Sequence, residues 1–470
     1  MTTRRIGESY DVIIVGAGPA GIFSGLELAR GRNGRISIAM IEKGPDIDAR
    51  VCPSTEQSSA CRRCDPCSVV SGWGGAGAFS DGKLTLSTQV GGMLDIYAGE
   101  EKLRELISYV DKIYLDFGAP PKVWGEDEEA IHELDRKAIL AELKLIPAPI
   151  RHLGTGKTKQ ILEGMKDELK QSTDIILGES AKRILVEDSK VIGVETSKGR
   201  VIKGSYVIVA PGRDGAEWLS EEARRLGLSM AINPVDIGVR VELPAVVAEP
   251  LTNVSYESKL IYHSRSFDDK VRTFCMCPYG AVVTESSDGL ITVNGHTHSE
   301  RKTENTNFAL LVSKTFTEPF NDPIAYGKYV AGLANLLGNG VIVQRLGDLI
   351  NGRRSIEERI AKGIVVPTLK DATPGDLSLV FPYRHLVSII EMLKALDAVA
   401  PGVYGRNTLL YGVEVKFYSS RLSVTRSLET QVRNLFTIGD GAGVTRGLMQ
   451  ASASGVVAAR EILRRLDIGE

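Results

Sequence analysis

The chain lacks the features that would assign it to a membrane, a nucleic-acid partner or a repeat architecture. No apolar run in its 470 residues approaches the ~20 residues that a membrane span needs, and residues 1–10 contain no signal-peptide core. Lys and Arg number 57 against 59 Asp and Glu, so the net charge of -2 provides no basic surface for nucleic acid. We find no internal repeat and no low-complexity tract. We therefore expect a cytoplasmic globular protein with no membrane span and no nucleic-acid partner.

Cysteine is scarce and unevenly placed. Four of the six cysteines are Cys52, Cys61, Cys64 and Cys67. The two-residue gaps let three thiolates converge on an iron–sulfur cluster, with Cys52 as the fourth ligand. A four-thiolate zinc site is the alternative, although such sites usually contain two CxxC pairs. Free or disulfide-forming thiols are the third interpretation, and disulfides are unusual in a cytoplasmic chain. Iron–sulfur, zinc and simple thiols all stay open.

Glycine, by contrast, is abundant, and three glycines mark the first motif of the chain. Residues 11–15 are rich in Val and Ile and predict a buried strand; GxGxxG follows, and residues 22–30 continue with helical periodicity. Gly16 permits the tight turn, Gly18 permits close approach of a pyrophosphate, and Gly21 permits close packing of helix on strand. The helix N-terminus favours the phosphate charge. The predicted dinucleotide contacts here are Gly16, Gly18, Pro19, Ala20 and Gly21.

An acidic residue follows at the expected distance. Residues 36–41 predict a second strand, and Glu42 stands at its end. A carboxylate in this place accepts hydrogen bonds from a ribose 2′-OH, which favours an adenosine ribose without a 2′-phosphate. Lys43 is included among the predicted contacts.

Two later segments complete the set, at residues 206–212 and 434–443. Together with the first turn, they resemble the motifs of glutathione-reductase-like FAD-binding flavoproteins, with Pro211 in place of the usual Thr. The resemblance implies that the dinucleotide is FAD and that Asp440 accepts a hydrogen bond from its ribityl chain. It also implies that the helix after Asp440 points its N-terminus at the pyrophosphate. The predicted contacts in these segments are Ala210, Gly212, Gly439, Asp440 and Gly441.

A glycine-rich stretch, GWGGAGAFSDGKL, occupies residues 72–84. Backbone amides in such a loop can approach a flavin or a pyrophosphate closely, whereas the alternative is a flexible surface turn. The predicted contacts are Gly74, Gly75, Ala76 and Ser80. Together with the cysteine segment, this stretch closely resembles a poorly characterised family of bacterial and archaeal FAD-dependent dehydrogenases, over nearly the whole chain.

The predicted fold class is α/β, with two domains. The first is a Rossmann-type FAD-binding domain with a parallel sheet and a small β-meander, formed by residues 1–230 and 425–470 with a cysteine-rich insertion at 50–70. The second is an inserted α+β substrate or cap domain with an antiparallel sheet at residues 231–424, predicted from strand-like pieces such as 237–242. No second GxGxxG lies between a strand and a helix, so we expect no dedicated NAD(P) domain.

The catalytic candidates lie in the inserted domain. Cys275 and Cys277 are two apart, so on a strand they share a face, and Tyr279 can donate a proton. The cysteines can be thiols near flavin C4a, ligands, or small core residues, and all three interpretations stay open. Candidates to receive an anionic substrate are Arg240, Arg384 and His385.

These features predict an FAD-dependent oxidoreductase that transfers hydride between a small organic substrate and flavin N5. A cluster at the four cysteines would allow single-electron relay to an electron-transfer partner. The alternatives are a flavin-dependent RNA-modifying protein and a redox-sensing FAD-binding protein; the near-neutral charge weighs against the first.

Overall fold

The computed structural model describes residues 7–31, 35–53, 64–80, 82–231, 233–287, 289–297, 302–320, 322–418 and 420–468. The chain divides into two compact units. Unit 1 comprises Met1–Lys122, Arg151–Ala231 and Ser419–Glu470, and unit 2 comprises Val123–Ile150 and Ile232–Tyr418. Of the predicted site residues, Cys61 lies outside the described residues.

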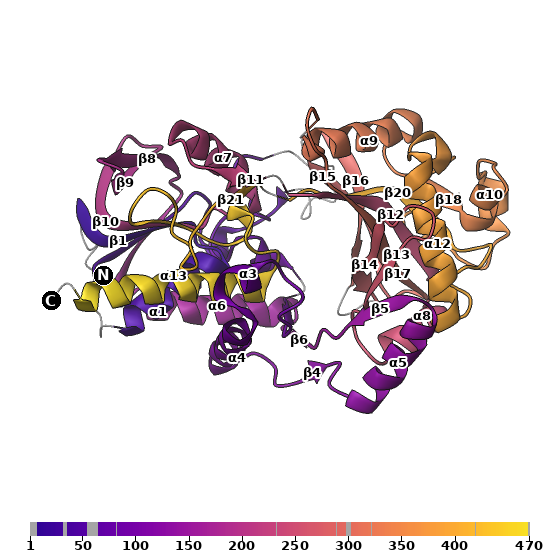
Figure 1. Ribbon diagram of the computed structural model, residues 1–470, viewed down its shortest axis with the longest axis horizontal. Coiled ribbons are helices and arrows are strands. Elements are labelled where there is room, and N and C mark those ends of the chain that lie inside the picture. Colours follow the sequence, from indigo (N-terminus) through magenta and orange to yellow (C-terminus); the bar gives the residue numbers. More distant parts are fainter. Residues whose placement is uncertain are drawn as a thin grey trace. The chain divides into compact units, whose positions relative to one another are not determined.

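Unit 1 is built on a sheet with a parallel and an antiparallel part (Figure 1). In spatial order the parallel strands are β7 (Thr173–Leu177), β2 (Ile38–Glu42), β1 (Ser9–Val15), β10 (Val201–Val209) and β22 (Leu435–Thr437). The antiparallel strands are β9 (Lys190–Thr196) and β8 (Ala181–Glu187). The central parallel strands are Val- and Ile-rich and buried, as strands covered on both faces must be. The prediction of a mixed α/β fold with parallel and antiparallel sheets is therefore confirmed.

Two helices far apart in the sequence lie side by side in unit 1, α1 (Pro19–Gly31) and α13 (Leu448–Ile468) (Figure 1). They touch at Gly455, where a Cβ atom would stand 2.2 Å from the carbonyl oxygen of Ala20. Only glycine allows this approach. The other helices are α3 (Leu94–Ala98), α4 (Glu100–Asp116), α6 (Thr155–Leu169) and α7 (Ala216–Arg225). Short strands are β3 (Lys83–Thr85), β6 (Ile150–His152), β11 (Met230–Ala231) and β21 (Arg421–Leu422).

Unit 2 is built on an eight-stranded sheet that is antiparallel except at one edge. In spatial order its strands are β19 (Thr373–Pro374), β18 (Ile342–Arg345), β20 (Leu409–Lys416), β12 (Val235–Pro244), β17 (Asn305–Lys314), β14 (Lys270–Cys277), β13 (Lys259–His263) and β5 (Leu143–Ile146). A separate hairpin consists of β15 (Ala281–Ser287) and β16 (Leu290–His296). The helices are α5 (Glu128–Leu140), α8 (Ala245–Thr252), α9 (Pro323–Gly338), α10 (Leu346–Ile350), α11 (Glu357–Ala361) and α12 (Tyr383–Val399). No helix in the described part of either unit is long and apolar enough to cross a membrane.

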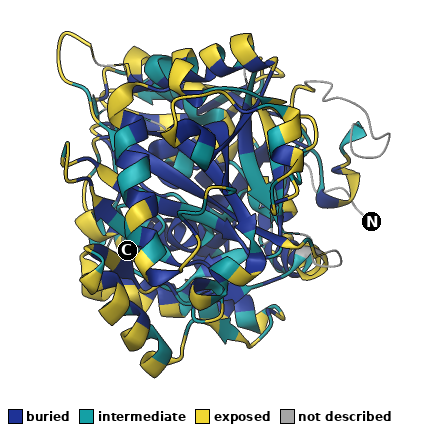
Figure 2. Cartoon of the chain, turned by 90° about the vertical axis from the view of Figure 1, so that its right-hand side faces the viewer, coloured by how far each residue is buried: buried dark blue, intermediate teal, exposed yellow. Residues whose placement is uncertain are grey.

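The central strand β12 separates an apolar face of this sheet from a polar one. Val239 and Val241 belong to a core shared with α9 and α12, whereas Arg240 and Glu242 point to the opposite face because side chains alternate along a strand. All four side chains are fully buried, and Figure 2 shows the strands as the buried interior of the molecule. Part of the polar face lies under the hairpin, since a Cβ on Gly295 would stand 1.8 Å from Arg240 Nη2.

Helical periodicity predicts a helix over residues 132–145, and this prediction is wrong at its C-terminal end. Helix α5 ends at Leu140, Glu142 adopts a left-handed conformation with φ 60°, and the chain then enters β5. Strand β5 pairs with β13, so residues 123–150 fall in unit 2 rather than in the first predicted domain. Helical periodicity in the sequence continued into a segment whose conformation is decided by strand pairing.

A buried histidine gives unit 2 a source of pH dependence. His385 is 3% exposed in the first turn of α12, and neither ring nitrogen has a hydrogen-bond partner in the described part of the chain. Burial lowers the pKa of His385 to about 4, with further lowering by the charges of Lys314 and Arg384 and an opposing effect of Asp269. The imidazole is therefore neutral in the folded protein at neutral pH.

We expect the free energy of unfolding to fall as the pH drops from 6.5 to about 4. In this range the unfolded chain binds a proton at His385 and the folded chain does not, which corresponds to about 3 kcal/mol. Denaturation of the wild type and of His385→Phe at pH 7 and pH 4 measures the effect. The stability lost on acidification should be smaller in the variant by this amount; equal losses would contradict the prediction.

Candidate functional site

The first glycine motif forms the turn between β1 and α1. Gly16 has φ 102°, and a Cβ there would stand 2.1 Å from the carbonyl oxygen of Ala210. A Cβ on Gly21 would stand 1.9 Å from the carbonyl oxygen of Gly16, so helix and strand meet without room for a side chain. The first helical hydrogen bond runs from Ile22 N to Gly18 O at 2.9 Å. The amides before Ile22 therefore have no partner within the helix and form an anion-binding end.

The glycine-rich loop lies directly against this turn. Gly74 N donates to Ala17 O at 2.8 Å, and a Cβ on Gly75 would stand 3.1 Å from Gly18 Cα. The fully buried Trp73 fixes the loop, because its Nε1 donates to Leu162 O at 2.8 Å. A Cβ on Gly18 itself would find only one protein atom within 4 Å, Gly75 Cα at 3.9 Å. The space beside Gly18 is thus left open by the described residues.

The two later motifs reach the same turn. A Cβ on Gly439 would stand 3.1 Å from the Cβ of Ala20, and a Cβ on Gly441 would stand 2.3 Å from the carbonyl oxygen of Gly212. Gly212 has φ 64°, and a Cβ added to it would meet no atom within 4 Å. Four segments, at residues 16–21, 72–80, 210–212 and 439–441, therefore converge within unit 1.

One carboxylate oxygen of Asp440 accepts hydrogen bonds from the residues that follow it in the chain. Oδ1 accepts hydrogen bonds from Thr445 Oγ1 at 2.7 Å and from Gly447 N at 3.2 Å. Oδ2 lies 3.8 Å from Nε of the exposed Arg213. The carboxylate is oriented by Oδ1, and Oδ2 keeps acceptor capacity for a ligand.

Glu42 joins three loops. Its Oε2 accepts from Ala17 N at 2.9 Å, and its Oε1 accepts from Gly44 N at 2.8 Å and Gly72 N at 3.0 Å. The side chain is buried. A carboxylate has about four acceptor sites, so one remains for a ribose hydroxyl. The ribose contact stays a prediction, and the structure adds a positioning role that the sequence did not reveal.

Two further predicted contacts, Lys43 and Ser80, have local partners. Lys43 Nζ lies 2.5 Å from Asp214 Oδ2, which also accepts from Ser71 Oγ at 2.5 Å. Burial would raise the pKa of Asp214, but the hydrogen bonds from Lys43 and Ser71 outweigh it and hold the pKa below its usual range. Ser80 Oγ donates to a carbonyl oxygen of its own loop at 2.9 Å, and Ala76 is exposed. The cofactor contacts of Lys43, Ala76 and Ser80 stay predictions.

Arg50, which no sequence motif marks, connects the cysteine segment to the glycine-rich loop. Its guanidinium donates to Ser68 O at 2.9 Å, Val69 O at 2.8 Å, Trp73 O at 2.7 Å and Gly75 O at 2.8 Å. Only 3% of the residue is exposed, and burial lowers the pKa of Arg50 to about 10. A planar group with five donors is suited to holding several carbonyls at once.

The cysteine segment is described only in part. Cys52 and Cys67 are half-buried and Cys64 is exposed. Within the described residues no three His, Cys, Asp or Glu side chains form a group that could hold a metal ion. Because Cys61 lies outside them, the four-cysteine metal site stays a prediction.

Unit 2 contains a fully buried ion pair beside the predicted catalytic cysteines. Arg240 Nη1 lies 3.4 Å from both carboxylate oxygens of Glu414, and both side chains are 0% exposed. Nε donates to Asn307 Oδ1 at 2.8 Å, and Nη2 donates to Cys275 O at 2.6 Å and Cys277 Sγ at 3.3 Å. All five guanidinium donors therefore have acceptors. Burial alone would lower the pKa of Arg240, but Glu414 and the two thiols hold it above its usual range.

The two cysteines do not lie on a regular strand. The pairing of β14 with β17 shifts between Phe274 and Cys277, and Cys275 has φ 44° at this bulge. The prediction that the two side chains share a face, which assumes the regular alternation of a strand, therefore does not describe their geometry. Both cysteines instead contact Arg240. Cys277 is buried and Cys275 half-buried.

Tyr279, the third catalytic candidate, directs its proton to a carboxylate. Its hydroxyl donates to Glu249 Oε1 at 2.7 Å, and this hydrogen bond, with burial, raises the pKa of Tyr279. Tyr279 has φ 52°, and Lys302 Nζ lies 4.9 Å from its ring centre. Of the candidates for an anionic substrate, Arg384 is held by Asp269 at 2.7 Å, while Arg240 and His385 are buried.

One comparison with known proteins concerns unit 2, and the others cover nearly the whole chain. Residues 234–417 match the family model described as FAD-dependent protein, C-terminal domain-like. The whole chain is 28% identical over 493 residues to an uncharacterized protein of Clostridium beijerinckii, covering 97% of this chain and 81% of that protein.

Among solved structures, L-proline dehydrogenase from P. horikoshii is 14% identical, with a TM-score of 0.41 over 99% of this chain and 100% of that one. A formate oxidase is 13% identical, with a TM-score of 0.47 over 99% and 100%. Similarity at this level supports no conclusion about the activity of this chain.

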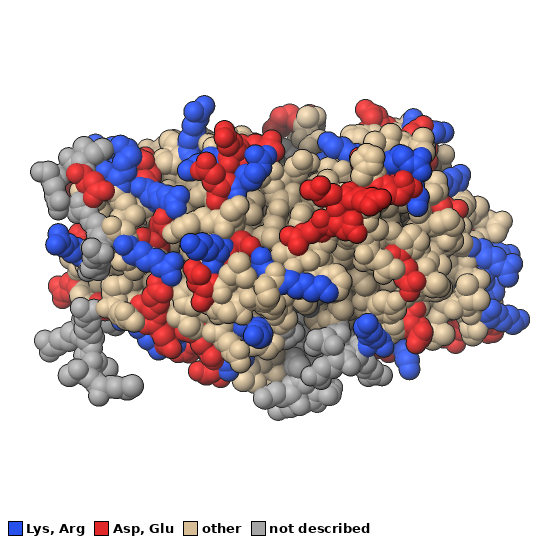
Figure 3. Space-filling view, turned by 90° about the horizontal axis from the view of Figure 1, so that it is seen from below, with Lys and Arg blue, Asp and Glu red and all other residues tan. Residues whose placement is uncertain are grey.

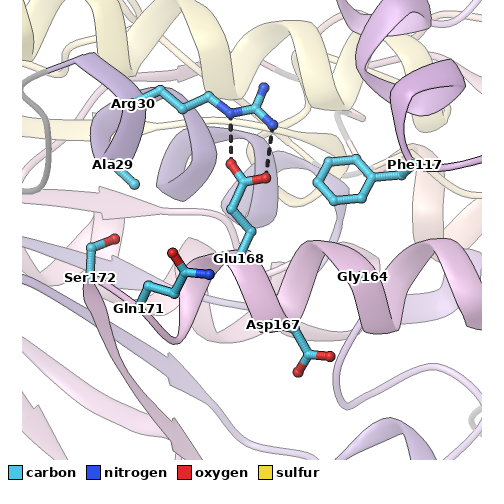
Figure 4. A pocket seen from close by; sticks show the side chains of 8 residues that line it. All are labelled: Ala29, Arg30, Phe117, Gly164, Asp167, Glu168, Gln171 and Ser172. Atoms are coloured by element: carbon cyan, nitrogen blue, oxygen red, sulfur yellow. Dashed lines mark hydrogen bonds and ion pairs between the residues drawn. The ribbon is translucent and has the colours of Figure 1, made fainter.

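A surface hollow of about 750 Å³ in unit 1 does not belong to this site (Figure 4). It lies at the far end of α1 from the glycine turn. Arg30 and Glu168 form a bidentate pair there, at 2.7 and 3.1 Å, beside the ring of Phe117. The remaining lining residues are Ala29, Gly164, Asp167, Gln171 and Ser172. The hollow contains none of the predicted contacts.

Proposed function

We propose that the chain is an FAD-dependent oxidoreductase that acts on a small organic molecule. The observation that carries the proposal is the convergence of four glycine-containing segments on the N-terminus of α1 in unit 1. A helix N-terminus approached by backbone alone suits a pyrophosphate. The match of residues 234–417 to a domain of FAD-dependent proteins supports FAD as the dinucleotide.

The residues of unit 1 fit FAD. The α1 amides and the open side of Gly18 would receive the pyrophosphate, Glu42 the adenosine ribose, and Asp440 Oδ2 the ribityl chain. Backbone groups of the loop at residues 74–80 would contact the flavin. When bound, FAD supplies a hydride acceptor at N5, while the protein orients the groups and excludes water.

In unit 2 we propose Cys275, Cys277 and Tyr279 as the catalytic residues. A guanidinium beside a thiol favours the thiolate. Arg240 donates to the sulfur of Cys277 and to the backbone carbonyl of Cys275, and its charge acts on both cysteines. Tyr279 would hold a proton with Glu249 as its acceptor. An iron–sulfur cluster at Cys52, Cys61, Cys64 and Cys67, with zinc as the alternative, would add an electron relay to a partner protein.

Identification of the bound cofactor tests the proposal. Protein purified without oxygen should show flavin absorption bands, and the cofactor released by denaturation should co-elute with FAD. Iron, zinc and sulfide analysis of the same sample decides the state of the four cysteines. A chain that binds no FAD even after addition of the free cofactor would overturn the proposal.

Arg50→Lys should weaken FAD binding. The lysine keeps the charge but cannot donate to four carbonyls, so the glycine-rich loop loses its connection and the affinity falls about tenfold. Titration of FAD into apoprotein measures the change. Arg224→Lys on α7, which replaces an exposed arginine, is the control. Equal affinities of the two variants would contradict the role of Arg50.

A redox-sensing FAD protein is the second candidate, because Arg50 connects the cysteine segment to the loop beside Gly18. An RNA-modifying role is less favoured. On the face drawn in Figure 3, Lys and Arg are interspersed with Asp and Glu rather than gathered in one basic patch. A cytoplasmic location remains a prediction.

A further inference from the structure

Three cationic side chains surround one aromatic ring on the polar face of the unit 2 sheet. The ring is that of Phe274 on β14. Arg272 Cζ lies 4.7 Å from the ring centre, Lys259 Nζ 5.1 Å and Lys416 Nζ 5.9 Å. These side chains come from strands β14, β13 and β20, and they are 12–20% exposed. We call this group the Phe274 cluster.

The cluster is short of carboxylates. Arg272 pairs with Asp236 at 2.5 Å, and Lys259 pairs with Glu257. Lys416 lies 3.2 Å from Glu414, but that carboxylate also serves the buried Arg240. Four cations therefore share three buried carboxylates.

The neighbouring carboxylates do not complete the cluster. Glu285 lies 3.7 Å from Lys416 and is 51% exposed, so water screens this pair. Glu242, on the same face as Arg240, is occupied by Tyr411, Thr368 and Asn305 and forms no ion pair with the cations of the cluster in the described residues. The partly buried ammonium of Lys416 thus shares its buried carboxylate, Glu414, with Arg240.

Partly buried cations of this kind gain most from an added anion, because low local polarity strengthens the attraction. The flat Phe274 ring and the planar guanidinium of Arg272 suit a planar group better than a compact one. We propose that the Phe274 cluster binds the carboxylate of an organic acid. The proposal rests on the proposed function, for which it supplies the substrate class, and all residues of the cluster lie within the matched range 234–417.

Calorimetric titration of the FAD-loaded protein with benzoate tests the assignment. Benzamide, which has the same shape without the charge, is the matched ligand. Benzoate should bind and benzamide should not, and binding should weaken as salt is added. Lys416→Met should lower the benzoate affinity about tenfold, as expected for one charge-assisted contact. Lys270→Met, an exposed lysine on the same strand as Phe274, should leave it unchanged.

A second variant separates the site from a loss of folding. Glu285→Gln removes the carboxylate that competes for Lys416, so the benzoate affinity should rise about twofold. No benzoate binding, equal binding of benzamide, or no response to Lys416→Met would overturn the proposal. If sulfate at an equal concentration displaces benzoate, the assignment of an organic acid is overturned, and the cluster is a site for inorganic anions. Flavin absorption of the same samples reports FAD separately, so a failure of the cluster is distinguished from a failure of the proposed function.

Discussion

Gly18→Ala is expected to leave the fold intact and to lower the FAD affinity on the order of 10–100-fold, as overpacking by 1–3 kcal/mol implies. The added Cβ meets only Gly75 Cα at 3.9 Å, an ordinary contact within the protein. The same Cβ occupies the open side of the turn beside the α1 amides, where the pyrophosphate is proposed to lie. The added methyl group should therefore weaken FAD binding and leave the stability of the fold unchanged.

Gly21→Ala is the matched variant in the same motif. Its Cβ would stand 1.9 Å from the carbonyl oxygen of Gly16, so the cost falls on the fold, about 1–3 kcal/mol of unfolding free energy. Thermal unfolding of the apoproteins and FAD titration separate the two effects. A Gly18→Ala protein that binds FAD like the wild type would show that the pyrophosphate does not lie at this turn.

The sequence identified the parts of unit 1 whose conformation is decided locally. The GxGxxG turn requires glycines for steric reasons that hold in any sequence context, and β1 and α1 follow from periodicity. The end of α5 was missed because Leu143–Ile146 becomes a strand only through its pairing with β13, more than a hundred residues away. Pairing over such distances leaves no local pattern.

The candidate site was predictable in its glycines and not in its charged residues. Arg50 stands in a polar stretch that looks like a solvated loop, yet it is buried because four carbonyls from two later segments surround it. Arg240 interrupts the apolar strand β12, which is a usable signal, since a charged residue in a buried strand requires a partner. The partner, Glu414, is supplied by a strand that only the fold brings alongside.

Glu414→Gln should destabilise unit 2 by about 3–5 kcal/mol, because it leaves the fully buried Arg240 without a carboxylate. Replacing both residues, as in Arg240→Met with Glu414→Met, should lower the free energy of unfolding less than Glu414→Gln alone. The double variant removes both charges of the pair, so Arg240 is not left buried without its carboxylate. Calorimetric unfolding of the two single variants and the double variant measures the coupling.

Glu285→Gln is the control for this cycle, as it removes a half-exposed carboxylate from the same neighbourhood and should change the unfolding temperature little. If the costs of the single variants simply add in the double variant, the pair does not act as a unit. Coupling together with loss of thiol reactivity at Cys275 in Arg240→Met would connect the buried pair to the proposed chemistry. The guanidinium that pairs with Glu414 also contacts Cys275 O and Cys277 Sγ, and its charge acts on both cysteines.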